Sequence, residues 1–502
     1  MANPLYDRLF GIHTGKSTPF LILPEGDTIT HAAFLAEAAQ LAHVLQDLGV
    51  KPGDRLAAQV GKSPQALALY AACVQAGVVF LPLNTAYTVD ELTYFIDNSG
   101  ATLVVCDAAK LAALAPVAKG LGAAITTLNA DGSGALMEAA ATKPTTFATV
   151  SRDADDLAAF LYTSGTTGRS KGAMLTQDNL LSNSQTLADL WRFTDQDVLL
   201  HALPIFHTHG LFVATNITLI AGGALIFLAK FDAGEMIRLM PRATAMMGVP
   251  TFYTRLLEEP DFTKDLVKDM RLFVSGSAPL LAETHIQFET RTGHRILERY
   301  GMTETNMNTS NPYDGERRAG TVGFPLPGIE LKITGSDGAA LPQGEVGQIE
   351  VRGPNVFKGY WQMPEKTREE LREDGFFLTG DLGRIDDEGY VHIVGRNKDL
   401  IISGGYNIYP KEIELVLDDQ PGVKESAVIG VPHADFGETV LGVLVAETGE
   451  DPDLEAIKSA AGAKLARFKH PRKLIIVDSL PRNTMGKVQK NLLRESYKDV
   501  FA

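Results

Sequence analysis

Short apolar runs alternate with longer Ala- and Leu-rich stretches through the first part of the chain. The runs at 55–60, 78–81 and 102–105 have the length and composition of buried strands, whereas the stretches between them are long enough for helices. The predicted helices cover residues 31–48, 64–76 and 108–119. The same alternation recurs from 179 to 290, and it is typical of parallel sheets covered by helices. The sequence therefore predicts two α/β sheet subdomains.

Beyond residue 330 the pattern changes to short strands and turns, as at 331–334 and 347–352, which indicates a small β-rich subdomain. The segment 375–399 is dense in glycine and charge, and the residues after it have β and α patterns of their own. We place a domain boundary near 395–399, because such segments commonly separate compact cores. The predicted fold is α/β, with a large N-terminal domain (1–395) and a smaller α+β C-terminal domain (396–502).

The apolar stretch 210–229 carries no charge and is long enough to cross a bilayer. However, Asn216, Gly222 and Gly223 interrupt it, and 224–228 has the composition of a buried strand. We therefore expect a core helix followed by a strand rather than a membrane span. The N-terminus has no basic region leading into an apolar run, so no secretory signal is predicted.

The amino-acid composition makes several classes of function improbable. The net charge of -15 argues against a nucleic-acid binder, which needs clustered positive charge. The cysteines Cys73 and Cys106 both lie in apolar segments, which disfavours disulfides and indicates a reducing, cytoplasmic setting. A local basic run near the C-terminus contains one acid, Asp478, and forms either a solvated face or a contact for a phosphate-rich small ligand. Its basic residues are Lys464, Arg467, Lys469, Arg472, Lys473, Arg482, Lys487, Lys490 and Arg494.

The segment 162–172 reads YTSGTTGRSKG and combines hydroxyls, glycines and Lys171. Glycines let backbone N–H groups turn toward one point, hydroxyls add donors and the lysine adds positive charge, which together favour a polyphosphate cradle. A polar linker has the same composition, but the apolar residues 157–161 before the segment indicate a loop between buried elements. Neither the Walker A spacing nor a dinucleotide-binding glycine pattern occurs in the chain.

Three further polar segments interrupt apolar surroundings. His207 and His209 lie just before the long apolar stretch, although such a histidine is more often packed or on the surface than catalytic. The segment 298–304 follows a strand predicted at 295–297 and offers an aromatic ring, a hydroxyl and a carboxylate at a strand end, where parallel sheets bind ligands. Near the C-terminus, Lys487 follows a glycine in a turn, a pattern that an ordinary surface lysine shares.

These segments, in their order along the chain, resemble the motifs of the adenylate-forming acyl-CoA synthetase superfamily. The resemblance extends over about residues 27 to 495. The resemblance implies an enzyme that uses ATP to convert a carboxylic acid to an acyl-AMP with release of pyrophosphate. The thiol of CoA then displaces AMP, with Mg²⁺ as the cofactor and no nucleic acid or membrane as a partner. Loading of a carrier protein is a second hypothesis, disfavoured because no carrier domain follows the Lys487 segment. A nucleotide-binding protein without chemistry is a third, disfavoured because the implied catalytic residues are intact.

The resemblance implies roles for individual residues of the ATP site. Lys171 and the loop before it would bind the β- and γ-phosphates, and Glu304 would hold Mg²⁺, for which a carboxylate oxygen is a suitable ligand. Ser170 stands where the family usually has a proline, which removes rigidity but no chemical group. The implied ATP-binding residues are Thr163, Ser164, Gly165, Thr166, Thr167, Gly168, Lys171, Ser277, Ala278, Pro279, Tyr300, Gly301, Met302, Thr303, Asp381, Arg396 and Lys487. The implied catalytic residues are Thr163, His207, Glu304 and Lys487.

Within this set, the resemblance places Tyr300 on the adenine ring and residues 277–279 on its opposite face. Thr303 would contact the α-phosphate. Asp381 would accept hydrogen bonds from both ribose hydroxyls, with assistance from Arg396.

The C-terminal domain has implied roles of its own. Lys398 occupies the hinge about which this mobile domain rotates between the two half-reactions. In the first half-reaction Lys487 would neutralise charge as the carboxylate attacks phosphorus, and a lysine acyltransferase acting on it is a further expected partner, because acylation erases that charge. After rotation, a glycine-containing loop would help form the tunnel for the pantetheine of CoA. The loop residues are Ser403, Gly404, Gly405 and Tyr406.

The resemblance implies that the substrate acid contacts His207, Ser277 and Arg299. Relatives that act on aromatic or fatty acids usually have a small residue immediately before the adenine-stacking tyrosine, whereas this chain has Arg299. A guanidinium in an apolar pocket is costly unless an anion meets it, and the second carboxylate of a diacid would do so bidentately. We expect a short dicarboxylic acid, malonate first, with methylmalonate and oxalate as alternatives. In the rival interpretation Arg299 pairs with Glu298 or another acid, and Arg242 is a weaker candidate for the same role.

Overall fold

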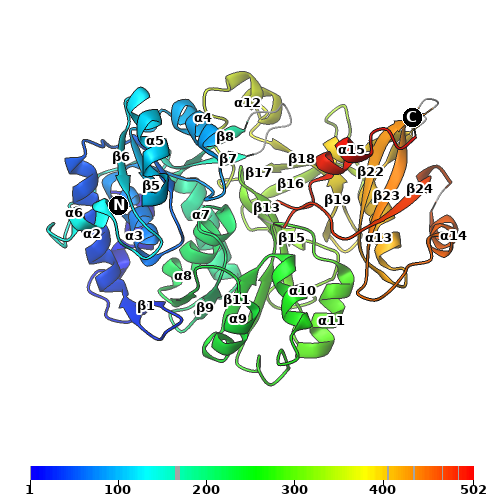
Figure 1. Ribbon diagram of the computed structural model, residues 1–502, viewed down its shortest axis with the longest axis horizontal. Helices are drawn as coiled ribbons and strands as arrows, with labels where there is room; N and C mark the ends of the chain where they lie inside the picture. Colours follow the sequence, from blue (N-terminus) through cyan, green and yellow to red (C-terminus); the bar gives the residue numbers. More distant parts are fainter. Residues whose placement is uncertain are drawn as a thin grey trace. The chain divides into compact units, whose positions relative to one another are not determined.

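The computed structural model describes residues 2–163, 170–403, 406–433, 436–465, 467–483 and 486–501 (Figure 1). The chain divides into two compact units. The first unit consists of Met1–Glu330 and Arg352–Phe377, and the second consists of Leu331–Val351 and Leu378–Ala502. The predicted α/β class is confirmed. The short strands after residue 330 belong mainly to the second unit. The predicted boundary between 395 and 396 stays a prediction.

One sheet of the first unit has the strand order β6-β5-β3-β4-β7-β8. Its strands are parallel except for β8, which is antiparallel to β7. They are β3 (Arg55–Gln59), β4 (Val79–Pro82), β5 (Leu103–Cys106), β6 (Ala124–Thr127), β7 (Leu157–Thr163) and β8 (Lys171–Thr176). Leu81, Val104 and Phe160 of this sheet pack against Phe95 and Leu114 of the covering helices. The strands predicted from the apolar runs are confirmed to within one or two residues.

The other sheet of the first unit has the order β15-β14-β13-β12-β11-β9-β10-β1-β2. Strands β1 and β9 to β13 form its parallel centre, and antiparallel strands flank that centre. They are β1 (Pro19–Ile22), β2 (Thr28–Thr30), β9 (Val198–His201), β10 (Ala224–Phe227), β11 (Ala245–Gly248), β12 (Leu272–Ser275), β13 (Leu297–Met302), β14 (Asn306–Ser310) and β15 (Phe324–Pro325). The predicted second α/β layer is therefore confirmed.

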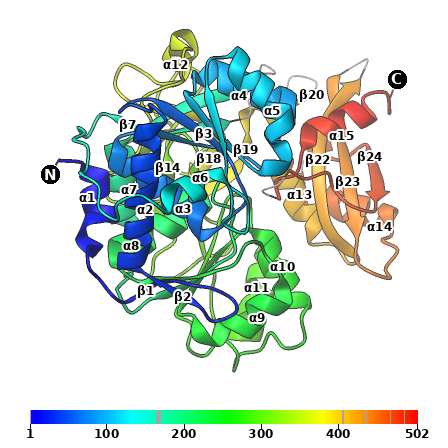
Figure 2. The ribbon, with the colours of Figure 1, turned by 60° about the vertical axis from the view of Figure 1, so that its left-hand side comes forward.

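Helices pack beside both sheets of the first unit. They are α1 (Pro4–Leu9), α2 (His31–Asp47), α3 (Pro64–Ala76), α4 (Val89–Ser99), α5 (Ala108–Gly120), α6 (Ala135–Ala140), α7 (Gln177–Leu190), α8 (Asn216–Ala221), α9 (Ala233–Leu239), α10 (Pro250–Glu258), α11 (Ala282–Thr292) and α12 (Pro364–Glu370). Figure 2 shows α2 beside α3, and α9, α10 and α11 gathered together, in agreement with their contacts.

Helix α3 shows why the sequence sets these boundaries. The Ser63 side chain accepts a hydrogen bond from the backbone N–H of Ala66, and Pro64 occupies the first turn, where no N–H is needed. Gly77 ends the helix with a left-handed φ of 70°, which a residue with a Cβ rarely adopts.

The uncharged stretch 210–229 is divided between several short elements. A π-helical turn, η2 (His209–Thr215), is followed by α8, a glycine turn at Gly222 and strand β10. The expectation of core helix and strand is confirmed. No helix in the described part of the chain combines the length and the apolar content that crossing a bilayer requires.

The second unit contains two sheets with the strand orders β16-β17-β18-β19 and β21-β20-β23-β22, with β24 beside β23. The strands of the first are β16 (Glu330–Thr334), β17 (Gly347–Arg352), β18 (Phe377–Ile385) and β19 (Val391–Arg396). Those of the second are β20 (Ile401–Ser403), β21 (Tyr406–Ile408), β22 (Val423–His433), β23 (Gly437–Ala446) and β24 (Lys473–Val477).

Helices cover both faces of the larger sheet in the second unit. They are α13 (Pro410–Asp418), α14 (Leu454–Lys464) and α15 (Lys490–Tyr497). Because strand side chains alternate, Val428 packs with Ile413 of α13 on one face, whereas Ile429 packs with Leu493 of α15 on the other. Helix α15 follows the Lys487 segment directly and is thus anchored to this core.

Candidate functional site

Strands β7 and β8 hold the two ends of the predicted phosphate cradle. Thr163 at the end of β7 pairs in register with Lys171 at the start of β8. The segment therefore joins two paired strands of one sheet, as the sequence predicts. Five predicted ATP-binding residues lie outside the described residues. They are Ser164, Gly165, Thr166, Thr167 and Gly168.

Lys171 is buried, and its ammonium contacts a tyrosine and a carboxylate. Its Nζ donates to the hydroxyl of Tyr360 at 3.0 Å and to both carboxylate oxygens of Glu370 at 3.1 Å. The Tyr360 hydroxyl also lies 3.0 Å from Oε1 of Glu304, which accepts a hydrogen bond from Oγ1 of Thr163 at 3.3 Å. The structure thus brings together three predicted residues, Thr163, Lys171 and Glu304, at the base of the cradle.

The pKa values of the two carboxyl groups in this network shift in opposite directions. Burial raises the pKa of Glu304, which is 4% exposed, against the lowering effects of its hydrogen bonds and of Lys171. Burial also raises the pKa of Glu370, but hydrogen bonds from Tyr360 and Lys366 and the charge of Lys171 outweigh it, so the net change is a lowering. Glu370 is therefore the anionic partner of Lys171. Burial and the two nearby carboxyl groups raise the pKa of Tyr360, which stays a neutral phenol.

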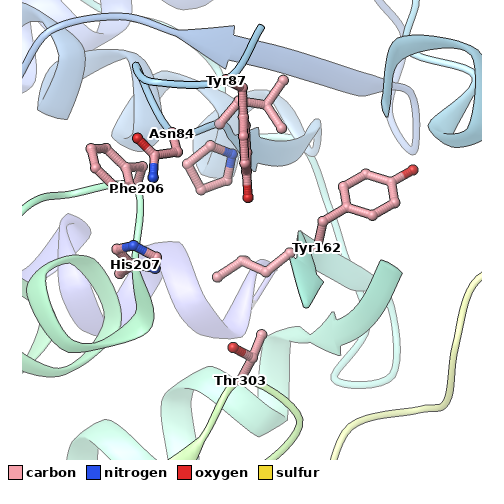
Figure 3. A pocket seen from close by; sticks show the side chains of 9 residues that line it. Asn84, Tyr87, Tyr162, Phe206, His207 and Thr303 are labelled. Atoms are coloured by element: carbon pink, nitrogen blue, oxygen red, sulfur yellow. The ribbon is translucent and has the colours of Figure 1, made fainter. Parts of the chain in front are cut away.

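An open pocket is lined in part by the chain neighbours of two residues of this network, Tyr162 before Thr163 and Thr303 before Glu304. His207 and Thr303 line it, together with Asn84, Tyr87 and Tyr162. Figure 3 shows Tyr87 and Thr303 on opposite sides of the pocket with His207 on a third side. The ring of Tyr162 points away, and its hydroxyl donates to Asn98 at 2.6 Å. The sequence-predicted His207 and Thr303 therefore face one space.

A second cluster surrounds the guanidinium of Arg299. The side chain is 3% exposed, and within the described part of the chain its Nε and Nη2 have no hydrogen-bond partner. The guanidinium lies against the backbone of Gly276, where an added Cβ would be 2.3 Å from Cζ. Burial lowers the pKa of Arg299 to about 9, so the group remains a cation at neutral pH. Nearby, Nδ1 of His209 lies 3.1 Å from Oγ of Ser277.

The acid of the rival interpretation lies near this cluster, because the charge of Glu298 opposes the lowering of the Arg299 pKa. Glu298 precedes Arg299 in strand β13, so the two side chains point to opposite faces, and Oε1 of Glu298 accepts from the backbone N–H of Leu280 at 3.2 Å. Arg242 is exposed at the end of the short helix η3 (Met240–Arg242). The orphaned donors of Arg299 are therefore available to an anionic ligand.

The predicted adenine-binding residues lie on β13 and on the loop after β12. Tyr300, Gly301 and Met302 form the end of β13, which begins at Leu297. The strand predicted at 295–297 is therefore wrong in its bounds, because the polar segment itself is the strand. Ser277 has a left-handed φ of 73°, a strained conformation for a residue with a Cβ, and the next residues, Ala278 and Pro279, are half-buried and exposed.

In the second unit, Asp381 and Arg396 form an ion pair. Nε of Arg396 lies 3.1 Å from Oδ1 of Asp381, and the two residues are register partners on β18 and β19. Lys398 lies on the exposed turn η4 (Asn397–Asp399), and Asp399 at its end pairs with Nη2 of Arg494 at 2.6 Å. The carboxylate and guanidinium predicted for ribose binding are thus adjacent.

The predicted lysine and CoA segments also belong to the second unit. Oδ1 of Asn483 accepts from the backbone N–H of Lys487 at 2.9 Å, and the carbonyl of Lys487 accepts from the backbone N–H of Asn483 at 2.9 Å. Ser403 pairs with Tyr406 across β20 and β21. The Tyr406 ring is 56% exposed and stacks on Phe468 with the centroids 4.6 Å apart. Gly404 and Gly405 lie outside the described residues.

Three residues beside the site have no assigned role in the sequence-based prediction. Tyr360 and Glu370 contact Lys171, and His209, which the sequence singles out only together with His207, is the histidine next to Ser277. The signal for His209 is its place ahead of the buried stretch, whereas no spacing signal points to Tyr360 or Glu370.

These features define the class of protein. A model of the AMP-binding enzyme family matches residues 13–361, and a model of the AMP-binding enzyme C-terminal domain matches residues 412–487. The chain therefore belongs to the AMP-binding enzyme family, as the sequence segments predict.

Individual members of the family are similar over much or all of the chain. A malonate–CoA ligase of Arabidopsis thaliana is 42% identical over 373 residues, which cover 68% of this chain and 61% of that protein. The chain thus matches about three-fifths of the length of that relative. The mitochondrial malonate–CoA ligase ACSF3 of Mus musculus is 36% identical, with 84% of this chain and 78% of that protein covered. The crystal structure of ATP-bound MatB from Rhodopseudomonas palustris has a TM-score of 0.98 and 59% identity, with both chains covered completely.

Proposed function

We propose that this chain is an ATP-dependent malonate–CoA ligase. Malonate and ATP give malonyl-AMP and pyrophosphate, and the thiol of CoA then displaces AMP to give malonyl-CoA. The observation that carries the substrate is the buried guanidinium of Arg299, whose Nε and Nη2 have no partner among the described residues. A buried cation of this kind needs an anion, and the second carboxylate of malonate supplies one. The similarity to two malonate–CoA ligases supports the same substrate.

His209 and Ser277 complete the polar side of the acid site. The imidazole and hydroxyl lie 3.1 Å apart and beside Arg299, so they can hydrogen-bond a carboxylate that the guanidinium holds. Burial, and the charge of Arg299 next, lower the pKa of His209, so this histidine is neutral and adds no second charge. One cation therefore meets one extra carboxylate, which distinguishes a diacid from a monocarboxylic acid. His207 borders the adjoining pocket.

ATP binds through the cradle and the strand end beside it. Lys171, Thr163 and the loop between them contact the β- and γ-phosphates, and Thr303 contacts the α-phosphate. Tyr300 stacks on adenine, with the loop of Ser277 on the other face. Asp381 and Arg396 hold the ribose. The ATP-bound state of the similar MatB structure supports a nucleotide site in this fold.

Glu304 would hold Mg²⁺ during the first half-reaction. Its carboxylate is buried at the base of the cradle, beside the lysine that binds phosphate, and it is a hard oxygen donor. No group of three or more His, Cys, Asp or Glu in the described part of the chain could hold a metal alone. Mg²⁺ commonly binds through one carboxylate plus substrate phosphates and water, so the residues present fit this ion. When bound, Mg²⁺ neutralises charge on the phosphates.

The C-terminal domain, which contains Lys487, rotates between the two half-reactions. In the division proposed here, residues 1–395 bind ATP and the acid, and residues 396–502 rotate about Lys398. Lys487 stabilises charge as a malonate oxygen attacks the α-phosphorus and pyrophosphate leaves. Ser403 and Tyr406 then contribute to the CoA site, and the exposed stacked rings of Tyr406 and Phe468 offer an aromatic surface for it. An acyltransferase that acylates Lys487 would switch off the first step.

A pyrophosphate-release screen tests this function. Mono- and dicarboxylic acids of two to six carbons are compared at equal concentration with ATP and Mg²⁺, with and without CoA. Malonate should give the highest rate, and thioester should form only when CoA is present. Equal turnover of butyrate, or release of ADP in place of AMP, would contradict the proposal. Replacing free CoA by a carrier protein in the second step separates the ligase from a carrier-loading enzyme.

A further inference from the structure

Lys171 has an internal anion as its partner in the structure. Its side chain is 9% exposed, and Glu370 accepts hydrogen bonds from Nζ on both carboxylate oxygens at 3.1 Å. The proposed function assigns the same ammonium to the β- and γ-phosphates of ATP. The carboxylate of Glu370 and the phosphate oxygens therefore compete for the same donors.

The carboxylate of Glu370 is held by more than this one contact. Tyr360 donates its hydroxyl proton to Oε2 at 2.5 Å, and Nζ of Lys366 lies 2.9 Å from Oε1. The Tyr360 oxygen also lies 3.0 Å from the Glu304 carboxylate. A triphosphate that reaches Lys171 thus approaches two carboxyl groups joined through one phenol, and repulsion by Glu370 opposes it.

Glu370 can leave this position without breaking the core. It is the last residue of α12, and its side chain is 22% exposed, so rotation toward solvent is open to it. The residue one turn earlier, Lys366, is 28% exposed and can keep its charge paired outside the site. Helix α12 has no buried residue that such a rotation would displace.

We infer that Glu370 is a positioning residue, and that its carboxylate and the phosphates of the nucleotide bind the Lys171 ammonium in turn. It aligns Lys171 while the site lacks nucleotide, releases it as ATP binds and takes it back as pyrophosphate leaves. This inference rests on the proposed function, in which Lys171 binds phosphate. Glu370 thereby lowers the affinity for ATP and for pyrophosphate and favours product release.

The test is the affinity of the full-length Glu370→Gln variant for inorganic pyrophosphate and for ATP, each with Mg²⁺, by titration calorimetry. The amide keeps the size and one acceptor oxygen but removes the competing charge. Both affinities should increase by about threefold to tenfold, the range expected for a partly exposed charge pair. Inhibition of turnover by pyrophosphate should strengthen by the same factor. A residue that only supports the fold would weaken binding when altered, so the direction of the change is diagnostic.

Glu369→Gln is the matched control. Glu369 is the neighbouring residue on α12, is 65% exposed and pairs with Lys366 at 2.8 Å, so its substitution changes the helix charge equally without touching Lys171. Its pyrophosphate affinity should stay within about twofold of the wild type. Thermal melting checks that both variants fold. If the glutamine variant does not, Glu370→Asp retracts the carboxylate and should raise affinity in the same direction by a smaller factor.

The outcomes are distinguishable because the calorimetric titrations with pyrophosphate and ATP need neither acid nor CoA. Unchanged or weaker pyrophosphate affinity in a folded Glu370→Gln protein would overturn the exchange, as would an equal gain in the Glu369→Gln control. Failure of the wild type to bind ATP or pyrophosphate would instead overturn the proposed function.

Discussion

Replacing Arg299 by methionine should affect malonate turnover and protein stability in opposite directions. Methionine has a similar length and fills the space beside Gly276 with an apolar group. Arg299 is 3% exposed and has two donors without partners in the described part of the chain, so in the free enzyme its charge is buried at a cost. In the complex with malonate, the same charge meets the second carboxylate.

The expected magnitudes follow from this burial. Removing one partner of a buried, hydrogen-bonded charge pair costs about 2 to 5 kcal/mol. At 1.36 kcal/mol per factor of ten, kcat/KM for malonate should fall about 30-fold to several thousandfold. Butyrate lacks the second carboxylate and should be turned over equally well or better. The free energy of unfolding of the ligand-free Arg299→Met protein should rise, by up to about 4 kcal/mol, the upper end of the gain found when buried ion pairs are replaced by apolar residues of similar volume.

Steady-state pyrophosphate release with malonate and with butyrate measures the first effect, and thermal unfolding without ligands measures the second. Arg242→Met is the control, because Arg242 is exposed and its loss should leave the turnover of malonate and of butyrate unchanged. An unchanged KM for malonate would refute the assigned role of Arg299. A loss of stability comparable to that of a core cavity would show instead that the guanidinium supports the fold.

Three further predictions concern other parts of the chain. Lys487→Ala should reduce pyrophosphate release about 100-fold while retaining thioester formation from preformed malonyl-AMP, and an equal loss in both assays would exclude the role in adenylation. Glu304→Gln should raise the Mg²⁺ concentration for half-maximal rate at least about tenfold, and an unaltered Mg²⁺ dependence would argue against the metal assignment. Burial, followed by repulsion from His13 and Lys16, lowers the pKa of His31 to about 4. The folded state therefore binds fewer protons, so its thermal midpoint should fall as pH drops from about 6.5 toward 4, and His31→Gln should reduce that fall. The same pH slope in wild type and variant would contradict this assignment.

The sequence predicts the parts of the site that are local in the chain. Thr163 and Lys171 belong to one short segment, and the strand register joins them as the composition of the segment suggests. Arg299 is recognised through the family resemblance, because relatives that act on aromatic or fatty acids usually have a small residue at this position before the tyrosine. The strand bounds near it are missed, because β13 is polar at its end and lacks the apolar run by which buried strands are detected.

The remaining site residues depend on long-range packing. Tyr360 and Glu370 reach Lys171 from 189 and 199 residues further along the chain, so no spacing rule connects them. Glu370 also belongs to a charged run that is typical of a solvated helix face. His209 and His207 are chemically equivalent in sequence, and the π-helical turn that begins at His209 determines which of them lies beside Ser277.

Isotope transfer tests the central claim most directly. Malonate with oxygen-18 in its carboxylates is incubated with the enzyme, ATP, Mg²⁺ and CoA, and the products are analysed by mass spectrometry. Attack of a malonate oxygen on the α-phosphorus, followed by displacement by the thiol, should leave one labelled oxygen in AMP and remove one from malonyl-CoA. Unlabelled AMP, or label in inorganic phosphate, would contradict the reaction through malonyl-AMP.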